Sequence, residues 1–374
     1  MGHRPAEDRG RSIGDNAGLP ATAFVPQATV PAAYVPLAEA TRGGVVESVH
    51  AGAVAVVDRK GRVLHAAGDP YTLTFTRSAL KPLQALPFAA GDGVARFGYS
   101  AAQVALMCAS HSGEPRHVEA VADMLARASC SAADLQCGTH APGFYEARGE
   151  VPPPPPYSTL QHNCSGKHSA MLAYCVQCGH DKADYLAFDH PLQQAIRRAV
   201  ACFTGVAEAR LIAGIDGCSA PNYAVPLASL AGAFARLASA EVDADYGTAP
   251  RALANAMIAH PEMVSGERRS DLALMQAGRG DWVTKIGAEG VQAIGIRSQG
   301  IGIAIKVADG QKRGLYPAIV AVLDALGVLD ATARTALAPW ARRPLRNYRG
   351  IETGEVRPAV ALSPQSSLSA ISRT

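Results

Sequence analysis

Runs of β-branched residues lie near both ends of this chain of 374 residues, and helix-type patterns fill the region between them. The alternation over 45–68, broken by a turn at 58–61, predicts a β-hairpin. Two further strands are predicted at 281–287 and 300–307. This order predicts an α+β fold whose antiparallel sheet comes from both chain ends, with a helical region inserted at about 82–275.

Inside the helical region, apolar periodicity predicts several helices. They are expected at 115–128, 170–176, 192–203 and 249–260, with Ser100 capping an earlier one and a last helix following at 314–326. The five prolines at 152–156 predict a surface polyproline segment, and 213–221 is interpreted as a glycine-punctuated loop.

The composition and the chain ends suggest a single domain. With 48% hydrophobic and 18% charged residues, the chain can bury a large core. Residues 1–30 lack periodicity and are expected to form a flexible tail, 31–355 a single α+β domain, and 356–374 a C-terminal tail after a last short strand from Asn347.

Charge and hydropathy indicate a small-molecule enzyme rather than a nucleic-acid or membrane protein. The formal net charge is only +3, and the basic group at 342–346 is interpreted as a solvated helix end. No apolar run reaches the roughly 18 residues that a membrane span needs. The N-terminus also lacks the apolar segment of a secretory signal, so a cytoplasmic location is expected.

The first chemical motif is Ser78-Ala79-Leu80-Lys81, at the start of an apolar-periodic stretch. On a helix, residues three apart share one face, so the two side chains can meet. A serine hydroxyl becomes a good nucleophile when a base removes its proton, and a lysine of lowered pKa can be that base. The same spacing also arises by chance in a solvated Ser and Lys.

Two further pieces follow in chain order. Ser110 lies in a polar break between two predicted helices, and Lys285 begins Lys285-Ile286-Gly287 on a predicted strand. Penicillin-recognising acyl enzymes carry Ser-x-x-Lys, a serine-bearing loop and Lys-Thr-Gly on a strand in this same order. Each piece has a purely structural alternative, but the three together favour an acyl-transfer serine enzyme.

A second constellation combines metal-ligand residue types. Cys164-x-x-Lys167-His168 and Asp216-x-Cys218 supply two thiols, a histidine and a carboxylate on two separate loops, as a zinc site would. Loop cysteines are also often small buried hydrophobes, so these residues alone leave both readings open.

These motifs together resemble the rhizobial-type L-asparaginases, the Ser-Lys asparaginases. The resemblance rests on the motifs that begin at Arg77, Cys108, His162, Asp216 and Lys285, and it runs from about Gly44 to the 340s. It implies a fold like that of serine β-lactamases and glutaminases, a homodimer, and hydrolysis of L-asparagine to L-aspartate and ammonia.

The resemblance also implies roles for individual residues. It implies that Ser78 with Lys81 and Ser110 with Lys285 form two catalytic Ser-Lys pairs. It implies zinc as the cofactor, held by Cys164, Lys167 and Cys218, and contacts with the substrate from Arg77, His168 and Asp216. Three alternatives stay open: an enzyme acting on another amide or lactam, such as a glutaminase or β-lactamase-like enzyme; a zinc amidohydrolase with incidental serines; and a non-catalytic asparagine-binding protein. The sequence also leaves open which serine is the nucleophile.

Overall fold

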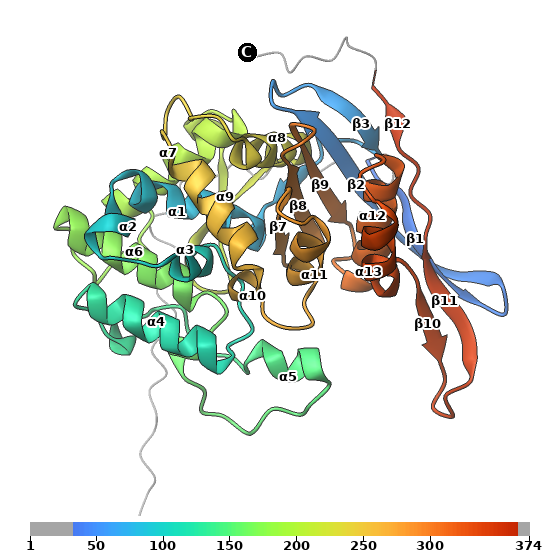
Figure 1. Ribbon diagram of the computed structural model, residues 1–374, viewed down its shortest axis with the longest axis horizontal. Coiled ribbons are helices and arrows are strands. Elements are labelled where there is room, and N and C mark those ends of the chain that lie inside the picture. The colour runs from blue at the N-terminus through green and yellow to red at the C-terminus, as the bar shows by residue number, and fades with distance from the viewer. Residues whose placement is uncertain (1–32, 366–374) are drawn as a thin grey trace, which may run out of the picture.

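The computed structural model describes residues 33–365 (Figure 1). A twisted sheet forms one side of the molecule and a group of helices forms the other, as Figure 1 shows. The N-terminal tail predicted at 1–30 lies outside the described residues. Among the described residues, no helix is long and apolar enough to cross a membrane.

The main sheet joins the two chain ends, which confirms the predicted α+β class. Its strands follow the antiparallel order β10-β11-β1-β2-β9-β8-β7, with β3 beside β2 and β12 beside β3. The bounds are β1 (Val35–Arg42), β2 (Val45–Asp58), β3 (Val63–Ala67), β7 (Trp282–Gly287), β8 (Val291–Ile296), β9 (Ile301–Val307), β10 (Arg343–Arg346), β11 (Glu352–Pro358) and β12 (Ser363–Pro364).

The two faces of this sheet are covered by different helices because side chains alternate along each strand. One face packs on α8 (Leu227–Ala238), and the opposite face packs on α12 (Lys312–Ala325) and α13 (Ala331–Ala341). Small residues such as Ala304 face α8, whereas isoleucines such as Ile303 face α12. At Gly302 an added Cβ would lie 1.8 Å from the carbonyl oxygen of Ala231, so α8 can approach this closely only over glycine.

The helical region lies between β4 and β7 in the chain. Its helices are η1 (Arg77–Leu80), α1 (Lys81–Ala90), α2 (Gly93–Arg96), α3 (Ala101–Met107), α4 (Pro115–Arg127), η2 (Ala132–Asp134), α5 (Gly143–Arg148), η3 (Thr159–Gln161), α6 (Ser165–Cys178), α7 (Pro191–Thr204), η4 (Glu208–Arg210), α8, α9 (Ala249–Ala259), α10 (Pro261–Val264) and α11 (Ser270–Ala277). The helices predicted within this region are confirmed, and Ser100 forms a capping box with Gln103 at the start of α3.

A second, small sheet was not predicted. It has the order β4-β6-β5, formed by β4 (Leu73–Phe75), β6 (Pro221–Pro226) and β5 (Ile212–Ile215). The interpretation of 213–221 as a loop is therefore wrong except for 216–220. β4 and β5 have only 3 and 4 residues, and β6 is buried on both faces, so none of them shows a sustained alternation of apolar and polar side chains.

The chain end also differs from the prediction. Residues 356–365 are not a tail, because β11 pairs with β1 over Val356–Pro358 and β12 pairs with β3. In the basic group at 342–346, only Arg342 lies at a helix end, as the C-cap of α13, and the other four residues form the edge strand β10. Both segments are polar and short, and only their pairing with distant strands makes them part of the sheet.

Candidate active site

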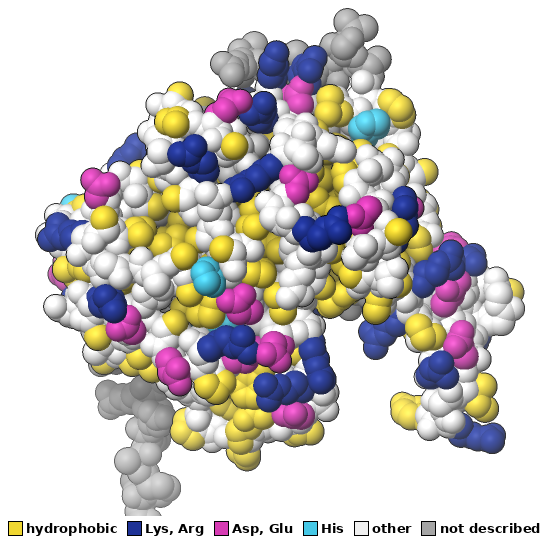
Figure 2. Space-filling model, viewed as in Figure 1, with side chains coloured by type: hydrophobic (Ala, Val, Ile, Leu, Met, Phe, Trp, Pro, Cys, Tyr) yellow, Lys and Arg dark blue, Asp and Glu magenta, His cyan; other side chains and the backbone are white. Residues whose placement is uncertain are grey.

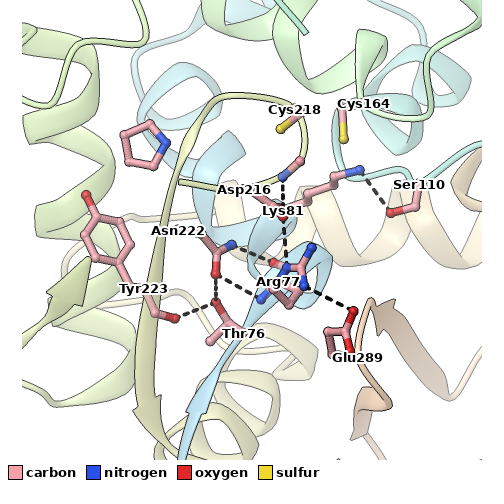
Figure 3. A network of polar contacts seen from close by, with 12 residues as sticks. Thr76, Arg77, Lys81, Ser110, Cys164, Asp216, Cys218, Asn222, Tyr223 and Glu289 are labelled. Atoms are coloured by element: carbon pink, nitrogen blue, oxygen red, sulfur yellow. Dashed lines mark hydrogen bonds and ion pairs between the residues drawn. The ribbon is translucent and has the colours of Figure 1, made fainter. Parts of the chain in front are cut away.

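Ser78 lies on a strained turn between β4 and α1. The preceding residue, Arg77, has a φ of 48°, which is uncommon for a residue other than glycine. Asn222 on β6 holds this turn: its Oδ1 accepts from the Arg77 N–H at 3.0 Å, and its Nδ2 donates to the Arg77 carbonyl at 3.0 Å (Figure 3). Thr76 adds a bond to the Tyr223 carbonyl at 3.0 Å. Strain held in this way is typical of functional positions.

Replacing Asn222 by alanine is expected to lower stability and turnover together. Asn222 is buried, so its loss leaves two main-chain groups of Arg77 without partners, at a cost of about 1–3 kcal/mol. The turn can then relax and displace Ser78. Chemical denaturation and steady-state kinetics check this, with Asn222→Asp as the variant that keeps the acceptor oxygen. Unchanged kcat in the alanine variant would show that other contacts set the turn.

Ser110 connects the two predicted lysines. Lys81 Nζ and Lys285 Nζ each lie 2.9 Å from Ser110 Oγ, and all three side chains are buried. Lys81 also donates to the carbonyls of Ala109 and, at 3.3 Å, Asn163. Three segments far apart in the sequence therefore form one continuous chain of polar contacts.

The predicted pairing is found for Ser110 with Lys285 but not for Ser78 with Lys81. Among the described residues, the Ser78 hydroxyl has no hydrogen-bond partner, and the Lys81 amine points to Ser110 instead. Ser78 is half-buried, whereas Ser110 is buried. Of the two serines, Ser78 is thus the one whose hydroxyl is both uncommitted and accessible.

Sequence analysis missed Asp271, which lies beside Lys285. Its carboxylate is completely buried and lies 3.6 Å from Lys285 Nζ, and it accepts from the Ile286 N–H and the Thr284 hydroxyl at 2.9 Å each. Burial lowers the pKa of Lys285 to about 7; Asp271 opposes this shift, and the charge of Lys81 adds to it. No motif marks Asp271, because it meets Lys285 only through the packing of α11 on β7.

Arg77 and Asp216, both predicted to hold the substrate, lie together. Arg77 Nε donates to Asp216 Oδ1 at 2.9 Å, and the same oxygen accepts from the Gly217 N–H at 2.9 Å. Burial would raise the pKa of Asp216, but Lys167, Gly217 and Arg77 outweigh it and hold this pKa below its usual range. Arg77 keeps a second, longer contact with Glu289 at 3.8 Å. The pair places a charged, oriented guanidinium next to Ser78.

The three predicted metal ligands also meet. Cys164 and Lys167 lie at the start of α6, and Cys218 lies on the loop between β5 and β6; Figure 3 shows both thiols near Lys81 and Asp216. Lys167 Nζ donates to Cys218 Sγ at 3.0 Å. The hydrogen bond with Cys218 and the nearby Lys81 and Lys167 amines hold the pKa of Cys164 well below its usual range, although burial opposes this.

These donors fit a zinc ion in type, with one uncommon member. Two thiolates and one amine are three ligands, which leaves one of zinc's four positions open. Within 33–365, no group of three or more His, Cys, Asp or Glu side chains is arranged to hold a metal, so such a site depends on the amine of Lys167.

His168 lies behind this cluster. Its ring is completely buried, and Nδ1 lies 2.7 Å from the Tyr185 hydroxyl. Burial, reinforced by Lys167, lowers the pKa of His168 to about 4, so the ring is neutral at pH 7. Nε2 of this ring has no hydrogen-bond partner among the described residues, and the predicted contact of His168 with the substrate stays a prediction. Tyr185 gave no signal in the sequence.

Comparisons with known proteins agree with the motifs. Residues 38–358 match the family model of L-asparaginase II, so the protein belongs to this family. This match confirms the resemblance found in the sequence, and the family implies a hydrolase. A comparison with curated proteins finds no match.

Solved structures also match this chain. A β-lactamase from Mycobacterium bovis is 15% identical, has a TM-score of 0.32, and is matched over 78% of this chain and 95% of its own. Mglu, in its native form in the presence of 4.3 M NaCl, is 15% identical, has a TM-score of 0.32, and is matched over 75% of this chain and 62% of its own.

Proposed function

We propose that this protein hydrolyses L-asparagine to L-aspartate and ammonia through an acyl-enzyme on Ser78. The observation that carries the proposal is the buried chain Lys81–Ser110–Lys285 beside an uncommitted Ser78 on a strained turn, in a member of the L-asparaginase II family. Two charged amines that contact the same hydroxyl repel each other, and the charge of Lys81 helps to lower the pKa of Lys285.

The chemistry follows from these positions. Ser78 Oγ attacks the side-chain carbonyl carbon of asparagine, and its proton enters the chain Lys81–Ser110–Lys285, in which the amine of Lys285 is the proton acceptor. Ser110, in contact with both lysines, returns a proton to the departing ammonia. A water molecule then attacks the β-aspartyl ester and releases L-aspartate and free Ser78. The N–H of Ser78, in the first turn of a helix, is placed to stabilise the oxyanion.

The remaining residues of the site bind the substrate in this proposal. The Arg77 guanidinium, held by Asp216 at 2.9 Å, would receive the α-carboxylate, since its planar fork matches carboxylate geometry. Cys164, Lys167 and Cys218 would hold zinc, which when bound supplies a positive charge that can fix an oxygen of the substrate. His168 would then orient Cys218 from behind rather than touch the substrate.

Ammonia release tests the proposed function directly. The purified protein should release ammonia from L-asparagine faster than from L-glutamine, measured with and without added zinc. A chromogenic cephalosporin offers the lactam alternative in the same experiment. Absence of ammonia from both amides in the presence of zinc would overturn the assignment.

Zinc binding should require Cys218 but not Cys178. We expect about one zinc per chain in the wild type after dialysis, and a large loss in Cys218→Ser, because two ligands rarely hold zinc. Elemental analysis measures this independently of activity. Cys178→Ser, which changes an exposed thiol at the end of α6, is the matched control. Equal zinc in both variants would contradict the site.

We further propose a homodimer formed through the strands that extend beyond the body of the sheet (Figure 1). Exposed apolar side chains gather on these extensions, among them Val45, Val46 and Val49 of β2 and Ile351 before β11. Such exposure is unusual unless a partner covers it. Light scattering of the wild type and of Val46→Asp tests this, and a monomeric wild type would exclude it.

A further inference from the structure

A basic cavity of about 400 Å³ is lined by residues other than the serines and lysines of the site. It is bounded by α5, the loop before α11, the start of α12, the end of α13 and β10, and Figure 2 shows Lys and Arg side chains on both sides of the hollow between α5 and the β10–β11 hairpin. Its cationic lining residues are Arg268, Arg269, Lys312, Arg313 and Arg343.

Most of this positive charge is not neutralised. Glu146 is the single carboxylate among the lining residues and pairs with Lys312 at 3.2 Å. Within residues 33–365, the side chains of Arg268, Arg269 and Arg343 make neither a hydrogen bond nor an ion pair. Guanidinium groups that converge on one cavity without counter-charges repel each other, and a bound anion would relieve this repulsion.

A further feature favours an anion with several charges. The cavity lies at the N-terminal turn of α12, a helix of 14 residues whose first N–H groups and dipole attract negative charge. A single carboxylate would satisfy only one of the free guanidinium groups, whereas a di- or triphosphate can accept from several.

The cavity also offers an aromatic wall. Trp340 and Tyr316 line it, with ring centroids 4.8 Å apart at 87°. Trp340 is half-buried, whereas the other tryptophan of the chain, Trp282, is buried. A planar ring attached to the phosphates could therefore contact Trp340, and tryptophan fluorescence would report its binding.

We propose that this cavity is a binding site for a small molecule that carries a di- or triphosphate group. The shared chemistry is the polyphosphate, which a nucleotide or an inorganic polyphosphate could supply. The site is separate from the proposed asparaginase chemistry, so the two can fail independently.

Binding of inorganic tripolyphosphate and of ATP to the full-length protein tests the proposal. Calorimetry at an ionic strength of about 0.1 M should show saturable binding, and Arg268→Gln/Arg343→Gln should weaken it by at least about tenfold. Arg349→Gln removes one positive charge from the exposed turn between β10 and β11 and should change affinity less than about twofold. Arg269 is left intact because its charge lowers the pKa of Lys285.

The outcomes separate the sources. Tighter binding of ATP than of tripolyphosphate, with quenching of fluorescence that is lost in Trp340→Phe, identifies a nucleotide site. Equal affinities identify a site for the polyphosphate group alone. The proposal is overturned if neither probe binds saturably, or if the Arg349 variant weakens binding as much as the double variant. Both substituted arginines of the double variant are exposed, so its folding can be checked by thermal unfolding against the control.

Discussion

Ser78→Ala is expected to lower kcat for L-asparagine by at least about 10⁴-fold, because no other group can form the ester once the nucleophile is lost. The residual rate would come only from substrate binding and charge stabilisation. Ammonia release measures the loss, and intact-mass analysis of acid-quenched reactions should show a β-aspartyl adduct in the wild type and none in the variant.

Ser110→Ala provides the contrast. Ser110 is the hydroxyl between two amines, so its loss should slow turnover by impairing proton transfer while still allowing the adduct to form on Ser78. If the adduct formed in Ser78→Ala but not in Ser110→Ala, Ser110 would be the nucleophile and Ser78 would not. The geometry favours Ser78 because its hydroxyl is half-exposed and uncommitted, whereas Ser110 is buried.

Lys285→Met is expected to reduce kcat/KM by roughly 10²–10⁴-fold, the usual contribution of a positioned proton-transfer group. In the wild type, burial lowers the pKa of Lys285 to about 7. Below that pH Lys285 is charged and cannot accept a proton. The value of kcat/KM should therefore rise with pH through an apparent pKa near 7. In a plot of kcat/KM against pH, the methionine variant should lack this rising limb.

Asp271→Asn tests the cause of this pH dependence. Asp271 opposes the effect of burial on Lys285, so removal of its charge should lower the pKa of Lys285 further and move the rising limb to lower pH. The asparagine keeps the size of the side chain, although Asp271 also accepts from Ile286 and Thr284, so some loss of stability is expected. A rise of kcat/KM that moves to higher pH would contradict the assignment of this pH dependence to Lys285.

The sequence by itself determined the chemical types in the site and the general class of fold. The spacing of Ser78 and Lys81, the strand position of Lys285 and the two cysteines are local patterns, so they were visible in the sequence. The α+β order followed from the spacing of apolar residues in the longer helices and strands. This spacing is visible in the sequence because one face of each element must be buried. The family match over 38–358 agrees with both.

Tertiary structure decided the partners of these residues. Lys81 contacts Ser110 rather than Ser78 because α1 packs against the segment that ends α3, a contact between residues 29 positions apart. Asn222 contacts Arg77 across 145 positions of the sequence because the small sheet brings β4 and β6 together. Asp271 contacts Lys285, about 14 positions away, because α11 packs on β7. A carboxylate or an amide has no local signature of such a role, because its hydrogen-bond partner is set by the fold and not by its neighbours in the sequence.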